Sequence, residues 1–461
     1  MKSFITAIPL LLAFLLLSCK DELTNKYIEA SSNNAQILLN GKVLYNNWTI
    51  TPDLKPDVLP IEALKNKKVF VHFKTDIDSF ERYISLGDTV DFTVLLNKKD
   101  SALTRVVGVP PKVNFTKKYI QQNKGKWSVE INEVQELFQI IAVITPTGLA
   151  DTRSMIINHD STDYYLSVLD KFLPYKNEPI VQKIDSLLKK NWYINLKADA
   201  NALEFKMNNT IGKTDIYDRM RGSKNLLEPY LGLMNDFAKK SNFRAFFKEN
   251  SAYYNSLMKW HEEAISTKKQ WDWLEQQFPD HYYDNYRITF SPLVKGNHST
   301  VRFNNNGFRQ AIMFIRPPYK VKNVNENVSN GLITRFVFTE IDHNYVNPET
   351  DKYIEQINDL FADREKWTNG RESKGYTTAY TIFNEYMTWS VYLLYCYDMY
   401  SAEDFNIIND RIVKYIVNRR GFHQFKAFHN TLLKLYKNKA PEATIANLYP
   451  ALLQWARNYK T

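Results

Sequence analysis

The hydrophobic pattern of the first quarter of the chain is that of short β-strands. From about residue 35 to 115, runs of β-branched and apolar residues are separated by turn-forming pairs such as Asn40-Gly41 and Gly87-Asp88. Short strands at regular spacing with such turns are typical of a small β-sandwich. The pattern predicts four strands in particular: Gln36–Leu39, Lys68–Phe73, Thr89–Leu96 and Thr104–Val109.

From about residue 128 to 277 the hydrophobic period changes to that of a helix. Apolar residues recur three or four positions apart, as at Ile180, Ile184, Leu187 and Leu188, which indicates amphipathic helices. Strand-like runs then return at 286–293, 299–303 and 310–315. A helix is expected over 329–344, with Asn347-Pro348 stopping it. Further helices are predicted at 377–400, 404–418, 421–436 and 442–459.

These patterns predict an α+β protein: a β-sandwich-like N-terminal domain, then a largely helical part that contains a small sheet. The length of 461 residues is enough for two to four domains. We expect a β-rich domain over 35–125, a helical region over 126–280 and a C-terminal core over 281–461.

The N-terminus is expected to be a lipoprotein signal. Lys2 precedes an apolar run from Phe4 to Leu17 that is short for a membrane span. The run ends in Leu16-Leu17-Ser18-Cys19, which resembles a bacterial lipobox. Residues 1–18 would be the signal peptide, Cys19 the lipidation site (diacylglycerol, palmitate) and 19–34 a polar tether. The alternative is a membrane anchor followed by an incidental cysteine.

This signal places the protein in the cell envelope, lipid-anchored to the outer membrane. The acidic pair in Lys20-Asp21-Glu22 resembles an export signal to the cell surface. Lipidation of Cys19 would leave Cys396 as a buried free thiol, since the chain has two cysteines. The net charge of +10 is spread along the chain without a basic, aromatic-rich run, so no nucleic-acid partner is expected.

One short motif carries possible chemistry, namely Thr339-Glu340-Ile341-Asp342-His343. A zinc peptidase has H-E-x-x-H here, in which two histidines four apart bind zinc and the glutamate polarises the metal-bound water. This chain has Glu340 and His343, but Thr339 stands at the first histidine position. E-x-x-H by itself is expected by chance on the order of once in two chains of this length.

A second element of the same chemistry lies downstream. Asn384-Glu385 falls on a predicted long helix, where Glu385 could supply a further ligand. Asp342 and His298 are candidates to replace the missing histidine. The structural alternative is an ordinary polar pair between Glu340 and His343, with His343 as the partner that a buried Glu385 requires even without metal.

Residues from about 120 to 440 resemble the bacterial lipoprotein family with domain of unknown function 4932. Its members carry H-E-F-x-H-x-x-V-N-P and a later N-E pair, which match residues 339–348 and Asn384-Glu385; residues 288–293 also resemble its strand before the site. The resemblance implies a zincin-like, gluzincin-type core with zinc as cofactor. It assigns His343 and Glu385 as metal ligands and Glu340 as catalytic base. Thr339 departs from the pattern and leaves two strong ligands.

Three functions therefore compete. The first is a degenerate, non-catalytic zincin-like lipoprotein that binds a peptide, glycan or other polymer in its cleft, and the ligand count favours it. The second is an active zinc peptidase with an unidentified third ligand. The third is a structural envelope protein. Whether the chain is an enzyme depends on Thr339.

Overall fold

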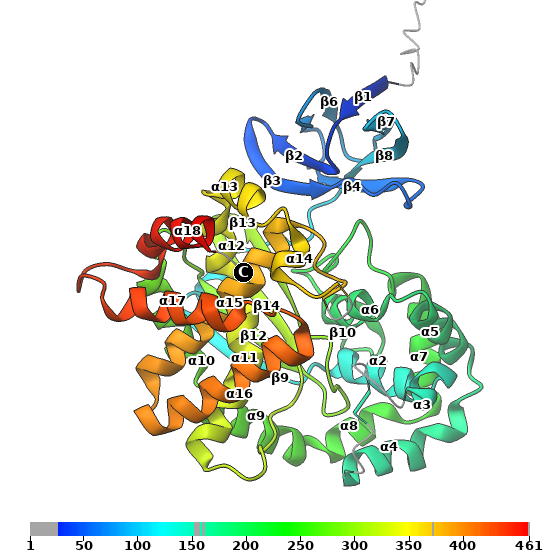
Figure 1. Ribbon diagram of the computed structural model, residues 1–461. Helices are drawn as coiled ribbons and strands as arrows, with labels where there is room; N and C mark the ends of the chain where they lie inside the picture. Colours follow the sequence, from blue (N-terminus) through cyan, green and yellow to red (C-terminus); the bar gives the residue numbers. More distant parts are fainter. Residues whose placement is uncertain (1–25, 152–156, 159–161, 371–372, 460–461) are drawn as a thin grey trace, which may run out of the picture. The chain divides into compact units, whose positions relative to one another are not determined.

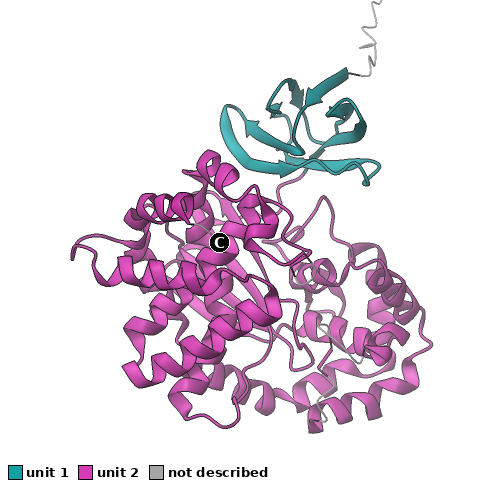
Figure 2. Ribbon diagram, viewed as in Figure 1, with its two compact units in different colours: residues 1–109 teal, residues 110–461 magenta. Residues whose placement is uncertain are grey.

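The computed structural model describes residues 26–151, 157–158, 162–370 and 373–459. The chain divides into two compact units, residues 1–109 and 110–461 (Figure 2). Their combination of sheets and helices confirms the predicted α+β class. The signal segment and Cys19 lie outside the described residues.

Unit 1 consists of two four-stranded sheets, with strand orders β1-β7-β8-β4 and β3-β2-β5-β6. Residues 26–30, inside the stretch expected to be a tether, form the edge strand β1 and pair in parallel with β7. The strands are β1 (Lys26–Ala30), β2 (Asn34–Leu39), β3 (Lys42–Thr49), β4 (Asp57–Glu62), β5 (Val69–Lys74), β6 (Ser79–Ile84), β7 (Thr89–Leu96) and β8 (Asp100–Val109).

Both sheets of unit 1 bury their inward side chains in one hydrophobic core. Alternation along β7 places Phe92 and Val94 inside, where Phe92 stacks on Phe80 from the other sheet at 4.2 Å between ring centroids. The predicted turn at Asn40-Gly41 joins β2 to β3 with φ of 49° and 78°, as a two-residue hairpin requires. The four predicted strands are confirmed as β2, β5, β7 and β8.

Unit 2 is built around a four-stranded sheet of order β13-β14-β12-β9. Its strands are β9 (Lys126–Glu130), β12 (Asn285–Phe290), β13 (Ser299–Asn305) and β14 (Phe308–Ile315), which confirms the three strands predicted near residue 300. β9 and β14 run parallel to β12, and β13 is an antiparallel edge strand. β9 lies in the range predicted to be helical. The sequence pattern did not reveal it, because a five-residue strand is too short to interrupt a helical pattern visibly.

Helices surround this sheet (Figure 1). The chain between β9 and β12 forms most of one group, together with α1 (Lys117–Asn123) before it. These helices are α2 (Glu133–Val143), α3 (Pro146–Ala150), α4 (Asp163–Phe172), α5 (Pro179–Lys189), α6 (Tyr193–Asp199), α7 (Leu231–Lys240), α8 (Phe243–Glu249), α9 (Ser251–Ile265) and α10 (Thr267–Gln277), with a small hairpin of β10 (Leu203–Phe205) and β11 (Ile211–Lys213).

The C-terminal helices form the second group of unit 2. They are α11 (Glu326–Ile341), α12 (His343–Asp351), α13 (Ile354–Leu360), α14 (Arg364–Trp367), α15 (Ala379–Met399), α16 (Ala402–Arg420), α17 (Phe425–Lys437) and α18 (Tyr449–Asn458). α15 begins at a Thr378 capping box and is buried from Ile382 to Cys396. Cys396 is a buried free thiol, as predicted, and no helix in the described residues is long and apolar enough to cross a membrane.

The helix around the motif differs from the prediction. Asn347-Pro348 does not stop it, because Pro348 lies inside α12. The break falls instead at Asp342, between α11 and α12. The helix restarts at His343, and Pro348, the sixth of its nine residues, removes one backbone hydrogen bond from the middle of this short helix. Glu340 therefore lies in the last turn of α11, whereas His343 begins α12.

Candidate functional site

A pocket of about 530 Å³ in unit 2 contains four of the residues that the sequence singled out: Thr339, Glu340, His343 and Glu385. Thr339 and Glu340 come from α11, His343 from α12 and Glu385 from α15. The remaining wall comes from α16, the loop before β13, further residues of α11 and α15, Arg316 directly after β14 and Tyr376 before α15. A volume of this size is within the roughly 300–1,000 Å³ typical of ligand sites.

The Glu385 carboxylate is held by cationic and indole groups. Its Oε2 lies 2.9 Å from an Arg420 guanidinium nitrogen and accepts a 3.1 Å hydrogen bond from Trp389 Nε1. Its Oε1 lies 3.8 Å from His343 Nε2. Arg420 also contacts the Tyr376 hydroxyl and stacks over the Trp389 ring at 5.3 Å. The side chain is 11% exposed, so a cation beside it is needed to offset the desolvation of its charge.

His343 is fixed through its other ring nitrogen. Nδ1 lies 3.2 Å from Asn347 Oδ1 and 3.4 Å from Thr388 Oγ1. These contacts turn Nε2 toward Glu385. An imidazole oriented in this way resembles a metal ligand with an outer partner, but the same arrangement also serves a simple ion pair with a carboxylate.

Glu340 lies at the back of the pocket beside the edge strand. Its Oε2 accepts a 2.8 Å hydrogen bond from the Thr300 hydroxyl. Burial raises the pKa of Glu340 above its usual value, while nearby His343 and Lys197 act in the opposite direction. Lys197 itself is fully buried and donates to the Asn297 carbonyl at 2.6 Å. Its burial lowers the pKa of Lys197 to about 7, against the opposing effect of Glu340.

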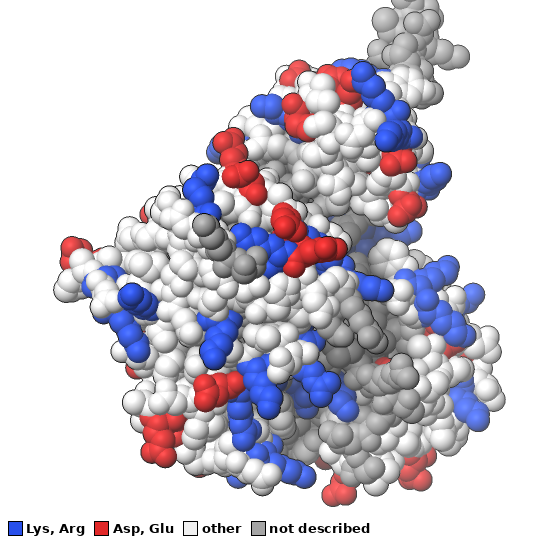
Figure 3. All heavy atoms as spheres, in the orientation of Figure 1, with Lys and Arg blue, Asp and Glu red and all other residues white. Residues whose placement is uncertain are grey.

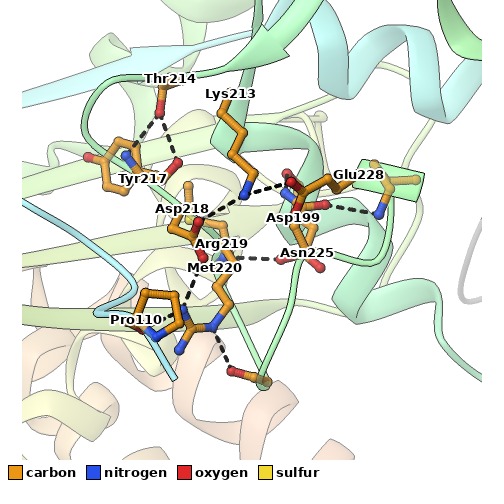
Figure 4. Close-up of polar contacts among 12 residues, drawn as sticks. Pro110, Asp199, Lys213, Thr214, Tyr217, Asp218, Arg219, Met220, Asn225 and Glu228 are labelled. Atoms are coloured by element: carbon orange, nitrogen blue, oxygen red, sulfur yellow. Dashed lines mark hydrogen bonds and ion pairs between the residues drawn. The ribbon is translucent and has the colours of Figure 1, made fainter. Parts of the chain in front are cut away.

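Arg221 reaches the same region from a separate loop. It donates to the Thr300 carbonyl at 3.0 Å, so it caps the outer edge of β13. A buried polar network anchors this loop (Figure 4). In it, Asp199 accepts from the backbone N–H of Met220 at 3.0 Å, and Arg219 donates to the Pro110 carbonyl at 2.8 Å.

The donor set does not fit a catalytic zinc. Two donors bound to one zinc at about 2.1 Å lie roughly 3.4 Å apart, so His343 and Glu385 could share an ion. Thr339 cannot replace the third ligand, because its hydroxyl donates to the Arg335 carbonyl one turn back at 2.8 Å. Over the described ranges, no three His, Cys, Asp or Glu side chains come close enough to hold a metal.

Neither replacement ligand considered from the sequence completes the site. Asp342 is fully buried and does not line the pocket. Its burial and the neighbouring Glu385 and Glu340 carboxylates raise its pKa well above the usual value. His298 does line the pocket, but it packs edge-on against Phe336 at 4.7 Å. Asp342 and His298 therefore leave His343 and Glu385 as the two strong donors.

The cationic part of the site was not predicted from the sequence. The pocket is also lined by Arg316, Arg335, Arg419 and Arg420. The sequence contains one weak indication of them, the adjacent Arg419-Arg420 before a helix-ending Gly421. Basic residues in the last turn of a helix are common for reasons unrelated to ligands, so this indication is not specific.

Comparison of the chain with protein-family models, with curated proteins and with solved structures finds no match.

Proposed function

We propose that this chain is a non-catalytic, zincin-like lipoprotein of the cell envelope that binds a peptide or another polymer in the pocket around Glu340, His343 and Glu385. One observation carries the proposal. The Glu385 carboxylate, which would be a metal ligand in an active relative, is paired with the Arg420 guanidinium at 2.9 Å. A guanidinium supplies the positive charge that a zinc ion would otherwise bring to this carboxylate.

The resemblance to the lipoprotein family with domain of unknown function 4932 belongs to the same proposal. It covers residues from about 120 to 440 and accounts for the order of Glu340, His343, Asn347-Pro348 and Glu385. The lipobox at Cys19 would anchor the protein to the outer membrane, with the cell surface as the proposed destination. The membrane lipid and a polymer ligand are then the expected partners, and nucleic acid is not.

The absence of catalysis is tested through the metal. Protein purified without chelator should contain far less than one equivalent of zinc, and added zinc should leave the melting temperature unchanged. Thr339→His restores the missing imidazole on a pocket-lining position, so it should produce zinc binding. Thr339→Ser is the matched control and should bind none. One tightly held zinc in the unaltered protein would instead establish the active-peptidase alternative.

Binding is tested with a fluorescent random hexapeptide pool. The unaltered protein should bind part of this pool, and Glu340→Gln should change the affinity because Glu340 lines the pocket. Glu326→Gln is the control, since Glu326 is exposed in the first turn of the same helix. Equal binding by Glu340→Gln, Glu326→Gln and the unaltered protein would place the ligand elsewhere. No binding at all would favour the structural envelope protein.

A further inference from the structure

The pocket carries more positive than negative charge. Two carboxylates line it, Glu340 and Glu385, against five cationic side chains: Lys295, Arg316, Arg335, Arg419 and Arg420. The difference is three positive charges. Figure 3 shows that lysines and arginines gather on the face of unit 2 where α16 lies. A pocket lined by one sign of charge concentrates ligands of the opposite sign.

Most of this charge is not neutralised by the protein. Arg420 is paired with Glu385. In the part of the chain that the structure describes, Lys295, Arg335 and Arg419 have no carboxylate within 4.0 Å. Of these three, Arg335 is half-buried and the other two are exposed. A half-buried guanidinium without a counter-ion is costly to keep, and a bound anion would offset that cost.

Aromatic rings hold the guanidinium groups in place. Arg335 stacks over Phe336 at 4.5 Å and over Tyr415 at 5.6 Å from the ring centroids. Arg316 lies over Tyr319 at 4.1 Å and approaches Phe336 at 5.7 Å. Stacking of this kind restricts the orientation of the planar guanidinium group before a ligand binds. Two of its N–H groups can then pair with the two oxygens of a carboxylate.

The same stacking disfavours a sugar ligand. A sugar ring would need an open aromatic face, but Phe336 carries two guanidinium groups and Trp389 is 5% exposed with Arg420 above it. Phe336 and Trp389 therefore orient cations and leave little free surface for stacking, whereas Tyr415, with Arg335 over its ring, is 40% exposed.

An uncharged donor or acceptor stands beside the cations. His298 Nε2 is buried without a hydrogen-bond partner in the described structure, and His298 lines the same pocket. Burial, followed by Lys197, Arg316 and Arg335, lowers the pKa of His298 to about 3, so the ring stays neutral. A neutral imidazole can complete the hydrogen bonds of a ligand without adding charge.

We infer that this pocket recognises a carboxylate of an acidic peptide, through Arg335 with Arg316 and His298 beside it. The inference rests on the proposed binding function and names its ligand class. Side chains, and not the backbone edge of β13, would recognise the peptide, because the Thr300 carbonyl at that edge already accepts a hydrogen bond from Arg221. Addition of the peptide as a further strand would have to displace this contact.

The test uses the whole mature chain and three labelled probes: deca-glutamate, deca-glutamine and a galacturonic acid oligomer. Deca-glutamate should bind best, and added salt should weaken it. Arg335→Gln should lower the affinity for deca-glutamate about tenfold or more. Arg335→Lys should cause a smaller loss, because lysine keeps the positive charge but lacks the planar guanidinium group. Arg411→Gln is the control, since Arg411 is exposed on the same helix as Arg419.

Melting temperatures of the variants exclude unfolding as the cause, and Arg335→Lys retains the stacked aliphatic stem if Arg335→Gln is unstable. Unchanged affinity for deca-glutamate in folded Arg335→Gln would overturn the inference. Tighter, Arg335-dependent binding of the galacturonic acid oligomer would overturn the assignment to a peptide. If deca-glutamine or the hexapeptide pool binds in a Glu340-dependent way while deca-glutamate does not, the carboxylate inference fails and the proposed function stands. If none of the probes binds, both fail.

Discussion

At the scale of single residues, the pair of Glu385 and Arg420 decides what the site can do. In a zinc peptidase a ligand carboxylate faces a metal ion. Here the carboxylate is satisfied by a guanidinium and an indole N–H, and the Thr339 hydroxyl is turned back to its own helix. The charge of the Glu385 carboxylate is therefore balanced within the protein.

The pair gives a prediction about stability. Arg420→Gln leaves the Glu385 carboxylate largely buried without its cation, so the free energy of unfolding should fall by about 2–3 kcal/mol. Glu385→Gln should cost less, because the arginine at the pocket keeps access to water. Denaturant unfolding of both single variants and the double variant should give a favourable coupling of about 1–2 kcal/mol. Additive losses would show that the two side chains do not stabilise each other.

At the scale of elements, the site depends on how closely α11 packs against α16. Gly331 in α11 is the contact point: a Cβ there would lie 2.4 Å from Ile408 Cδ1 and 3.3 Å from Tyr400 Cζ. The Gly331 carbonyl also accepts a 2.7 Å hydrogen bond from Tyr392 on α15. A glycine inside a helix is unfavourable by itself, so the close approach of the helices explains why it is accommodated.

Gly331→Ala should therefore destabilise the protein by about 1–2 kcal/mol, since crowding against the buried Ile408 outweighs the gain in helix propensity. Gly232→Ala in α7 is the matched control: apart from its chain neighbours and the backbone of its own helix, no atom lies within 4 Å of the new methyl group. It should stabilise by about 0.5–1 kcal/mol. Ile408→Val should recover part of the loss in the Gly331→Ala background. Equal effects of the two alanines in chemical denaturation would refute the packing argument.

At the scale of the whole molecule, the two units have separate cores. Every strand pair of the two sheets in unit 1 lies within residues 26–109, and both sheets share one hydrophobic cluster. The pocket belongs entirely to unit 2. The stability of unit 1 and the ligand affinity of unit 2 can then be altered separately.

A fragment of residues 26–109 should fold alone, with a β-type circular dichroism spectrum and a cooperative thermal transition. A fragment of residues 26–99 is the control and should stay unfolded, because β8 pairs with both β7 and β4. An unfolded 26–109 fragment, together with a single transition in the mature chain, would contradict independent units.

Sequence reasoning worked where the relevant information is local. The alternation in Thr89–Leu96 and the Asn40-Gly41 turn both depend on neighbours a few positions away. It failed at Pro348, where a proline predicts a helix end but the helix had already restarted at His343. It also missed β9, whose partner β12 begins more than 150 residues later.

The sequence by itself determined the α+β class, the β-rich start and the four motif positions, because hydrophobic period and turn chemistry are local properties. Only the tertiary structure decided what surrounds Glu385. Arg420 is 35 positions away on another helix, and Arg335 and Arg316 come from two further segments. Such contacts depend on helix packing, which no local spacing encodes. The motif residues were therefore visible in the sequence, whereas the cationic character of their pocket was not.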